Sequence, residues 1–307
     1  MKNRICFFAH YDQDGIIDDY VVYYIKELKK VCNDIVFASV SNVSEKEQKK
    51  LDGIITTFIN RENEGYDFGS WRDGMKHIGF ENLSQYDEVV LANDSCYGPI
   101  YNIEDVFATM EIKKIGAWSI TIGESISRYL QSYFLVLRKE VFEKEFFVDF
   151  FLKVENKGSK IDYIKDFELG FSKLLMANNI KIAAYCKVSF LDTFKQGTIL
   201  KIKAWYLRKF IPKYIRWTKS FGDDHKNLTK RQRIMLTIRK LCNLNYSNPS
   251  LIMVSIMIRK YKLPIVKVML FRDNPFYENI RRAEKMIKKY TKYDFSLIER
   301  HLHRVGK

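Results

Sequence analysis

Residues 89–99 read Val-Val-Leu-Ala-Asn-Asp-Ser-Cys-Tyr-Gly-Pro. Four apolar residues predict a short buried strand, and the polar run Asn93-Asp94-Ser95 follows it directly, before the stop at Gly98-Pro99. In open α/β sheets, ligands bind beyond the carboxyl ends of the strands. A carboxylate such as Asp94 can hold a divalent cation against a phosphate at that place. Since Asp and Asn also favour turns, capping of a turn by Asp94 is an equal alternative.

The sequence before this strand alternates strand and helix signals. Apolar runs at residues 4–9, 35–40 and 54–59 predict strands, and helical patterns begin at Asp18 and Ser44 between them. Such alternation is typical of a parallel sheet with crossover helices. Later patterns add strands at residues 115–120, 132–137 and 180–185, and helices at residues 103–110 and 139–151. We expect an α/β fold with a mostly parallel sheet and flanking helices.

The composition describes a globular protein. Of the 307 residues, 47% are hydrophobic and 15% aromatic, which excludes a disordered chain. No apolar run reaches 18 residues, and the apolar run after Arg4 is too short for a signal peptide, so we expect a cytoplasmic protein. The five cysteines form no C-x-x-C pair and predict reduced thiols instead of zinc ligands or disulfides.

Positive charge is concentrated in residues 201–307. This region holds 27 Lys and Arg against 7 Asp and Glu, and it carries the chain to its net charge of +15. We therefore divide the chain into a catalytic domain, residues 1–200, and a basic, mostly helical region, residues 201–307. Basic and aromatic residues alternate in 201–217, which suits a helix on an anionic membrane surface. Single-stranded nucleic acid would suit it equally, but no nucleic-acid-binding motif accompanies it, and we expect no nucleic-acid partner.

Two further stretches carry candidate site residues. Gly65 and Gly69 bracket Tyr66-Asp67-Phe68 before an expected helix, and free N–H groups there could bind an anion, although ordinary turns share this pattern. Asp166 and Glu168 precede a second expected helix. Acidic residues at such a place are favoured by the helix dipole, but a carboxylate at a cleft is also what a general base needs.

These motifs, taken in order, resemble the rhamnan synthesis F family of bacterial polysaccharide glycosyltransferases. The matching residues are His10-Tyr11-Asp12, Arg61-Glu62-Asn63, Gly65-Tyr66-Asp67-Phe68-Gly69, Asn93-Asp94-Ser95 with Gly98-Pro99, Gln131-Ser132-Tyr133-Phe134, Asn248-Pro249-Ser250 and the run from Leu263 to Pro275. The resemblance covers nearly the whole chain.

The resemblance implies a GT-A-like, Rossmann-type fold that uses a nucleotide-sugar donor. Many GT-A enzymes carry two carboxylates where Asn93-Asp94-Ser95 has one. Asp94 would hold Mg²⁺ or Mn²⁺ together with the donor diphosphate, or a metal is dispensable. Glu168 would be the catalytic base, with Asp166 beside it. Donor binding would fall to His10, Tyr11, Asp12, Asn63, Gly65, Tyr66, Asp67, Gly69, Asn93, Ser95, Gln131 and Ser132.

The expected function is an inverting rhamnosyltransferase. It would move L-rhamnose from dTDP-rhamnose to a growing polysaccharide or lipid-linked oligosaccharide, while peripherally bound to the anionic inner face of the cytoplasmic membrane. One alternative is transfer of galactose, glucose or galactofuranose from a UDP-sugar. Another is a non-catalytic scaffold that docks a polysaccharide-synthesis complex onto the membrane.

Overall fold

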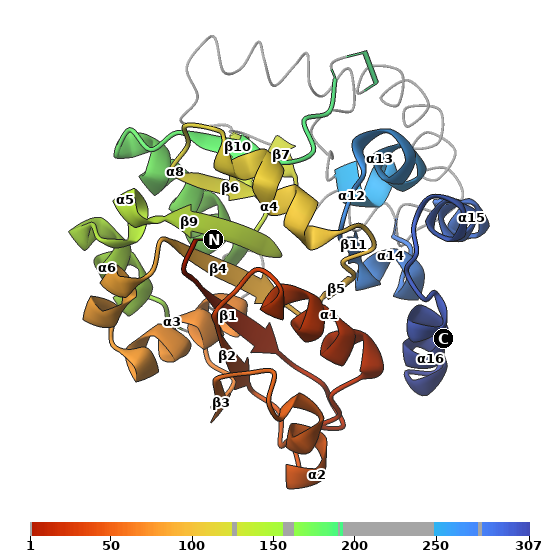
Figure 1. Cartoon of the computed structure of the whole chain (residues 1–307), viewed down its shortest axis with the longest axis horizontal. Helices are drawn as coiled ribbons and strands as arrows, with labels where there is room; N and C mark the ends of the chain where they lie inside the picture. Colours follow the sequence, from red (N-terminus) through yellow and green to blue (C-terminus); the bar gives the residue numbers. More distant parts are fainter. Residues whose placement is uncertain (1, 125–127, 156–162, 190, 193–248, 276–277) are drawn as a thin grey trace.

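The structure is a computed structural model that describes residues 2–124, 128–155, 163–189, 191–192, 249–275 and 278–307 (Figure 1). The expected domain boundary after residue 200 and the basic and aromatic stretch 201–217 lie outside the described residues. Within the described ranges, no helix is both long and apolar enough to cross a membrane.

The described strands form a central seven-stranded sheet in the order β10-β6-β9-β4-β1-β2-β3. All its pairings are parallel except those of β9, which runs antiparallel to β4 and β6. The mostly parallel sheet is therefore confirmed. The strands are β1 (Arg4–His10), β2 (Asp34–Ser39), β3 (Thr57–Asn60), β4 (Glu88–Asn93), β6 (Ala117–Ser119), β9 (Phe134–Arg138) and β10 (Ile182–Ala184). A separate hairpin joins β7 (Ile122–Glu124) to β8 (Arg128–Leu130).

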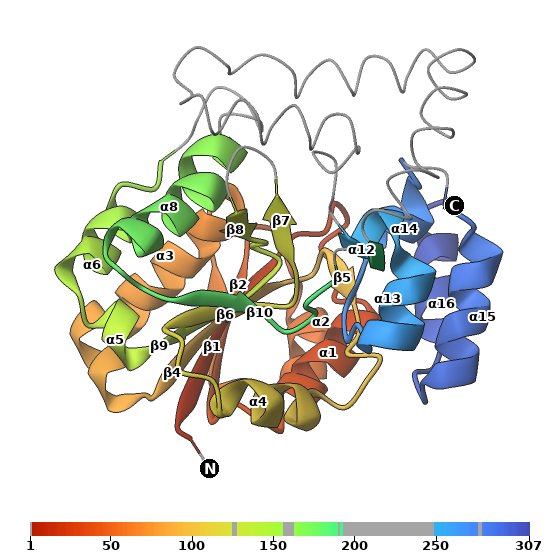
Figure 2. The ribbon, with the colours of Figure 1, turned by 90° about the horizontal axis from the view of Figure 1, so that it is seen from above.

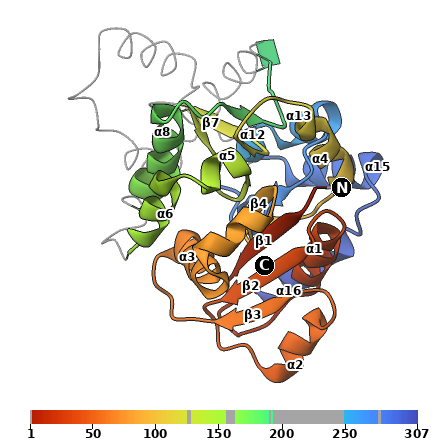
Figure 3. The same ribbon diagram turned by 60° about the vertical axis from the view of Figure 1, so that its left-hand side comes forward.

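Helices cover both faces of the sheet, which is why β1 and β4 are buried along their whole length. One face carries α1 (Asp19–Lys29) and α4 (Ile103–Glu111), and the short α2 (Glu45–Gln48) precedes β3 (Figure 2). The other face carries α3 (Tyr66–Ile78), α5 (Lys139–Phe142), α6 (Glu145–Leu152) and α8 (Gly170–Ala177), which Figure 3 brings forward.

The single helix expected at residues 139–151 is wrong, because the structure contains two helices there. Lys144 has an extended backbone (φ −88°, ψ 142°) and separates α5 from α6. This break resets the helical register, so that Phe147 and Phe151 are fully buried in the aromatic core. Phe146 and Phe150 are only partly buried at its margin.

The described part of the basic region packs beside α1 (Figure 1). It consists of α12 (Pro249–Ile252), α13 (Val254–Tyr261), β11 (Val266–Lys267), α14 (Val268–Arg272), α15 (Ile280–Tyr290) and α16 (Ser296–Arg304). β11 pairs antiparallel with β5 (Cys96–Tyr97), directly after Asn93-Asp94-Ser95. The buried residues of this described part of the basic region share one hydrophobic core with α1 and α4. This part of the chain is therefore built into the body that carries the sheet.

A buried ion network lies at the amino ends of the strands. Arg4 and Glu88, the first residues of β1 and β4, are 2% and 1% exposed and meet at 2.7 Å between Nε and Oε2. Arg138 also contacts Glu88, at 3.2 Å. Paired in this way, the charges can remain buried. This network fixes β1 against β4 at the edge opposite to their carboxyl ends.

The cysteines agree with the expectation from the sequence. Cys6, Cys32, Cys96 and Cys186 are buried free thiols, whereas Cys242 lies outside the described residues.

Candidate functional site

The carboxyl ends of β1 and β4 lie side by side where the order of the sheet reverses. From β1 the chain proceeds through α1 to β2 and β3 on one side, and then returns to place β4 on the other side of β1. Open α/β sheets bind ligands at such a switch point. The segments that leave it are His10-Tyr11-Asp12 and Asn93-Asp94-Ser95, so the structure brings two of the predicted site segments together.

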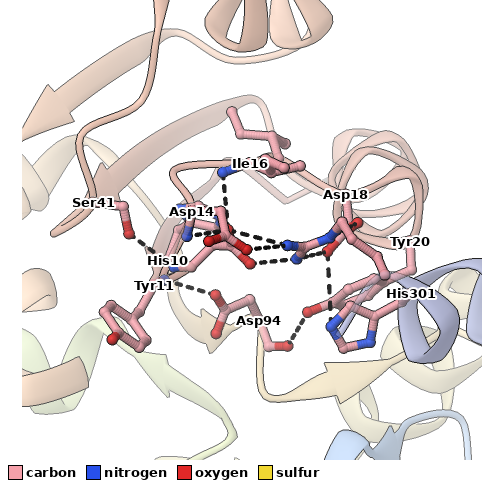
Figure 4. Close-up of polar contacts among 12 residues, drawn as sticks. His10, Tyr11, Asp14, Ile16, Asp18, Tyr20, Ser41, Asp94 and His301 are labelled. Atoms are coloured by element: carbon pink, nitrogen blue, oxygen red, sulfur yellow. Dashed lines mark hydrogen bonds and ion pairs between the residues drawn. The ribbon is translucent and has the colours of Figure 1, made fainter. Parts of the chain in front are cut away.

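Asp94 joins the two segments. Its Oδ2 accepts a hydrogen bond from the Tyr11 backbone N–H at 2.7 Å. Its own N–H donates to the Ala9 carbonyl, and the Tyr20 hydroxyl donates to the Asp94 carbonyl at 2.9 Å (Figure 4). Asp94 therefore holds β4 to the loop after β1, which is a structural role at this turn.

The surroundings of Asp94 are strongly negative. Burial raises the pKa of the Asp94 carboxyl well above its ordinary value, and the nearby carboxylates of Asp67 and Asp12 raise this pKa further. A group in such a field gains from a cation brought close to it.

Asp12 is held in place by backbone and by Arg304. Its Oδ1 accepts the N–H groups of Asp14 and Ile16 at 3.0 Å each, and the Arg304 guanidinium binds its other oxygen. Burial alone would raise the pKa of Asp12, but the Ile16 N–H and the Arg304 charge outweigh it and lower this pKa. Arg304 also contacts Asp18, at 2.6 Å, so that α16 is tied to this loop.

His10 lies beneath this surface. Its ring is 3% exposed, packs against Phe37 and places Nδ1 3.0 Å from the Ser39 hydroxyl. Burial lowers the pKa of His10 to about 4, so the ring is neutral at physiological pH. Tyr11, in contrast, is 59% exposed and is available to a ligand.

The glycine stretch forms the start of α3 and not a free loop. Gly65 is the N-cap with φ +76°, whereas Gly69 is already helical, and its N–H donates to the Gly65 carbonyl at 2.7 Å. The prediction of Gly69 as an anion-binding amide is therefore corrected. Gly69 is required for another reason, because a Cβ there would lie 1.9 Å from the Glu64 carbonyl oxygen. The buried Arg61 side chain secures the stretch by contacts to Glu64 and Asp73.

Asp67 reaches the end of β4 from the first turn of α3. Its Oδ2 accepts the Asn93 amide at 2.8 Å, and the Asn93 Oδ1 accepts the Ser95 hydroxyl at 2.5 Å. Asp67, Asn93 and Ser95 thus form one polar chain beside Asp94. Asn63 and Tyr66 are exposed at the outer rim.

Glu168 lies in a π-helical turn, Ile164–Leu169, that precedes α8. Its Oε1 accepts the Ser132 backbone N–H at 3.0 Å. Burial raises the pKa of Glu168, although the Lys267 charge and the Ser132 N–H act in the opposite direction. π-Turns within helices are frequent at functional sites. Asp166 is exposed in the same turn, whereas Gln131 is 2% exposed and bound to the Thr121 hydroxyl.

Two cationic residues of the site carried no assigned role in the sequence. Arg304 comes from α16, and Lys267 comes from β11, where it pairs with Cys96. The only sequence signal for Lys267 was its place in the family-like run from Leu263 to Pro275. For Arg304 there was none, because an arginine near the end of a basic helix has no local pattern that marks it.

A divalent cation fits this site only if it is shared with a ligand. Among the described residues, no three His, Cys, Asp or Glu side chains converge to hold a metal ion. Asp12 is bound by Arg304, and Asp67 is bound by Asn93, so Asp94 remains as the acidic donor. Mg²⁺ is commonly held by one or two carboxylates together with phosphate oxygens. The residues present fit that arrangement.

Sequence similarity to curated proteins covers part of the chain. An uncharacterised protein of Sinorhizobium fredii is 24% identical over 174 residues, 55% of this chain and 45% of the relative. The virulence protein VirA of Vibrio anguillarum is 26% identical over 144 residues, 45% of this chain and 46% of the relative. The chain therefore spans about half the length of these curated relatives.

Two solved structures share some spatial similarity. Core-mannan synthase A of Aspergillus fumigatus, in its Mn/GDP form, aligns with 50% of this chain and 63% of its own at 10% identity and a TM-score of 0.32. A cytidylyltransferase of Leptospira borgpetersenii aligns with 59% of this chain and 74% of its own at 13% identity and the same TM-score. Scores of this size do not identify a common fold.

The family comparison reaches much further. Residues 35–240 match the family described as rhamnan synthesis protein F, which is more than half of the chain. This range contains the glycine stretch, the end of β4 and Glu168. The chain belongs to the rhamnan synthesis protein F family.

Proposed function

We propose that this protein is a glycosyltransferase of polysaccharide synthesis that takes its sugar from a nucleotide-sugar donor. One spatial arrangement carries the proposal. Asp94 stands at the switch point of the sheet, and the strand pair β5–β11 leads from it to Lys267, whose ammonium lies over the Tyr133 ring. The neighbouring Ser132 holds Glu168. This arrangement supports a diphosphate ligand at Asp94 and Lys267 and a base for the acceptor at Glu168.

The donor would bind across the ends of β1 and β4. Tyr11 and Tyr66 are exposed and could stack on the base or the sugar, and Asn63 lies beside them at the rim. Asp67, Asn93 and Ser95 offer oxygen and amide groups to the donor, whereas the buried His10 and Gln131 would support the site from within the fold. Mg²⁺ or Mn²⁺, when bound, would neutralise the diphosphate beside Asp94.

Glu168 would act as the general base of an inverting transfer, with Asp166 near the acceptor. The acceptor hydroxyl oxygen attacks the anomeric carbon as the bond to the diphosphate oxygen breaks, and the hydroxyl proton passes to Glu168. Because burial raises the pKa of Glu168, its carboxylate is a stronger proton acceptor than an exposed one. A π-helical turn carries this carboxylate, and such turns are frequent at functional sites.

Membership of the rhamnan synthesis family supports dTDP-rhamnose as donor, with a polysaccharide or lipid-linked oligosaccharide as acceptor. The test is calorimetric binding of the purified chain to dTDP-rhamnose, UDP-galactose, UDP-glucose and UDP-galactofuranose, each with Mg²⁺, together with measurement of released nucleotide. We expect the tightest binding for dTDP-rhamnose. Tighter binding of a UDP-sugar would replace dTDP-rhamnose by that UDP-sugar as the donor. No binding to any of the four would refute the function.

A second candidate function, a scaffold at the membrane, is favoured by α15. Its apolar residues Ala283 and Ile287 are buried against the core, whereas Arg281, Arg282, Lys285 and Lys289 are exposed. An electrostatic contact with anionic lipid is therefore open to this helix, and insertion of its apolar face is not.

The membrane role is tested by flotation with vesicles of phosphatidylglycerol and phosphatidylcholine. Exchange of Arg281, Arg282, Lys285 and Lys289 for Glu should abolish flotation while preserving nucleotide binding. Flotation equal to that of the unaltered protein would exclude α15 as the contact. Nucleotide binding without flotation of either protein would favour the transferase without a membrane role.

A further inference from the structure

β11 delivers a lysine to the candidate site from a distant part of the chain. Lys267 is paired with Cys96 in the β5–β11 ladder, and the next backbone N–H, of Val268, donates to the Ser95 carbonyl at 2.9 Å. The backbone of Lys267 is therefore tied directly to the segment that follows Asp94. Its position cannot shift without breaking these backbone bonds.

The Lys267 side chain extends from this anchor toward the candidate base. Its Nζ lies 4.7 Å from the centre of the Tyr133 ring. The ring itself is fixed, because Tyr133 is buried and its hydroxyl lies 2.7 Å from the Thr121 Oγ1. The preceding residue, Ser132, holds Glu168 through its N–H, so the ring under the ammonium adjoins the segment that binds the candidate base. Its positive charge acts to lower the pKa of both the Cys96 thiol and the Glu168 carboxyl, against the effect of burial.

No carboxylate of the described residues lies within ion-pair distance of the Lys267 ammonium, although its charge acts on Glu168. Within the described residues, Lys267 makes no ion pair or hydrogen bond through its side chain, although it is half-buried. Two other cations that the structure describes at the site are engaged, Arg61 by Asp73 and Arg304 by Asp12 and Asp18. A half-buried charge left without a partner is costly unless a ligand of opposite charge binds there. The cation–π contact with the face of the Tyr133 ring compensates part of that cost.

We propose that Lys267 binds the diphosphate of the nucleotide-sugar donor and stabilises the leaving nucleoside diphosphate. This inference rests on the proposed function. As the acceptor oxygen bonds to the anomeric carbon, the bond from that carbon to the phosphate oxygen breaks, and its electron pair remains on the phosphate. The acceptor proton goes to Glu168. The negative charge that grows on the phosphate lies beside the Lys267 ammonium, a place where a fixed cation lowers the barrier.

This assignment accounts for the single carboxylate at the end of β4. A site with one acidic metal donor holds a cation weakly, and a lysine that contacts the same diphosphate supplies part of the charge that a metal would otherwise supply. The donor site is then composed of a segment from each part of the chain. The basic region would take part in the reaction as well as in the fold.

The test compares nucleotides that differ only in phosphate number. UDP and UMP, and dTDP and dTMP, are titrated into the full-length protein by calorimetry, once with Mg²⁺ and once with EDTA. Lys267→Ala should weaken binding of UDP or dTDP by about tenfold and affect the monophosphates much less, because the lost contact is to the diphosphate. Lys267→Arg should restore most of the affinity.

Two controls keep the outcomes distinct. Lys289→Ala removes an exposed charge of α15 and should leave all affinities unchanged, which separates a local contact from a change in net charge. Thermal unfolding of the Lys267 variants verifies that they are folded. If the unaltered protein binds UDP or dTDP and Lys267→Ala binds them equally well, the role of Lys267 is refuted and the proposed function stands. If the unaltered protein binds no nucleotide, the proposed function itself fails.

Discussion

Arg304 in α16 forms an ion pair with Asp12, 292 positions earlier, at the end of β1. The same guanidinium contacts Asp18 at the start of α1 and Asp14 between them. The loop after β1, which brings the Tyr11 N–H to the Asp94 carboxylate, is therefore held by one residue that lies far away in the sequence. Its conformation depends on the docking of α16 as much as on its own sequence.

Arg304→Ala should destabilise the protein. Removal of the guanidinium leaves Asp12 and Asp18 close together without the Arg304 charge. The ion pairs that are lost are mostly buried, since the Arg304 side chain is 21% exposed and each aspartate side chain 14%. We expect a loss of about 1–3 kcal/mol in the free energy of unfolding, between the values for surface and buried pairs, measured by urea denaturation at pH 7.

Arg300→Ala on the same helix is the matched control. Arg300 pairs with Asp19, and both side chains are more than half exposed. Its removal should leave the urea midpoint almost unchanged. Equal losses for the two variants would mean that the Arg304 pairs contribute nothing beyond an ordinary surface charge.

Glu168→Gln should separate binding from transfer. The amide keeps the size of the side chain and can still accept the Ser132 N–H, but it cannot take a proton. Donor affinity should remain within about twofold, while the rate of transfer falls by roughly 10²–10⁴-fold, the usual contribution of a general base. Transfer at the unaltered rate would remove Glu168 from the mechanism.

The pH dependence of transfer should report the environment of Glu168. Because burial raises the pKa of Glu168, the rate should fall with decreasing pH at a value above the ordinary glutamate range. The Lys267 charge lowers this pKa, so Lys267→Ala should shift the acid limb of the rate profile to higher pH. A limb at the same pH in both proteins would show that the two groups do not interact.

Asp94→Asn should weaken metal-dependent donor binding. The Asn side-chain oxygen can still accept the Tyr11 N–H, so the turn should survive, but the negative charge offered to a cation is lost. We expect donor affinity in Mg²⁺ to fall to the level measured in EDTA. Affinity that depends on Mg²⁺ in the variant as much as in the unaltered protein would exclude Asp94 as the metal ligand.

His10 should make the fold sensitive to mild acid. Its pKa is about 4 in the folded protein and about 6.5 in an unfolded chain, because burial disfavours the charged ring. The unfolded state therefore binds more protons between these values, and stability is lost as the pH falls from about 6.5 toward 4. The loss should approach about 3 kcal/mol for this group. His10→Gln should show a flatter dependence of stability on pH over this interval, and an equal slope would contradict the prediction.

The ion network at the opposite edge of the sheet should matter for stability alone. Glu88→Ala removes the buried carboxylate that Arg4 and Arg138 share, and Glu111 remains as a second acidic partner of Arg4 alone. We expect a loss of about 3–5 kcal/mol in the free energy of unfolding, as for other buried pairs that lose one partner. Nucleotide affinity of the folded fraction should not change, because the carboxyl ends of the strands carry the candidate site. Lys2→Ala, which removes a more exposed partner of Glu88, should cost much less.

The sheet could be predicted because local patterns determine it. β1, β2 and β4 are apolar runs, and they were expected within one or two residues of their observed bounds. β9 was also expected, but its antiparallel direction depends on pairing with β4 and β6, which no local pattern encodes. The π-helical turn around Glu168 was missed for the same reason, since its residues have ordinary helical character.

Part of the candidate site was also open to prediction. Asp94, Asp67 and Glu168 follow strands or begin helices, where sequence reasoning finds carboxylates. The partners that set their properties come from elsewhere in the chain. Tyr11, Asn93 and Ser132 reach them through backbone or amide groups that have no sequence signature, and Lys267 arrives through β-pairing with a segment far away in sequence.

The contact between Tyr97 and His301, 204 positions apart, has a consequence for biosynthesis. β5 cannot pair with β11, nor can Asp12 meet Arg304, until the last of these residues has left the ribosome. Contacts between such distant residues form slowly and late in folding. A nascent chain can therefore complete β1 to β4 before Lys267 and Arg304 are in place, and the proposed donor site is assembled only after residue 304 has emerged.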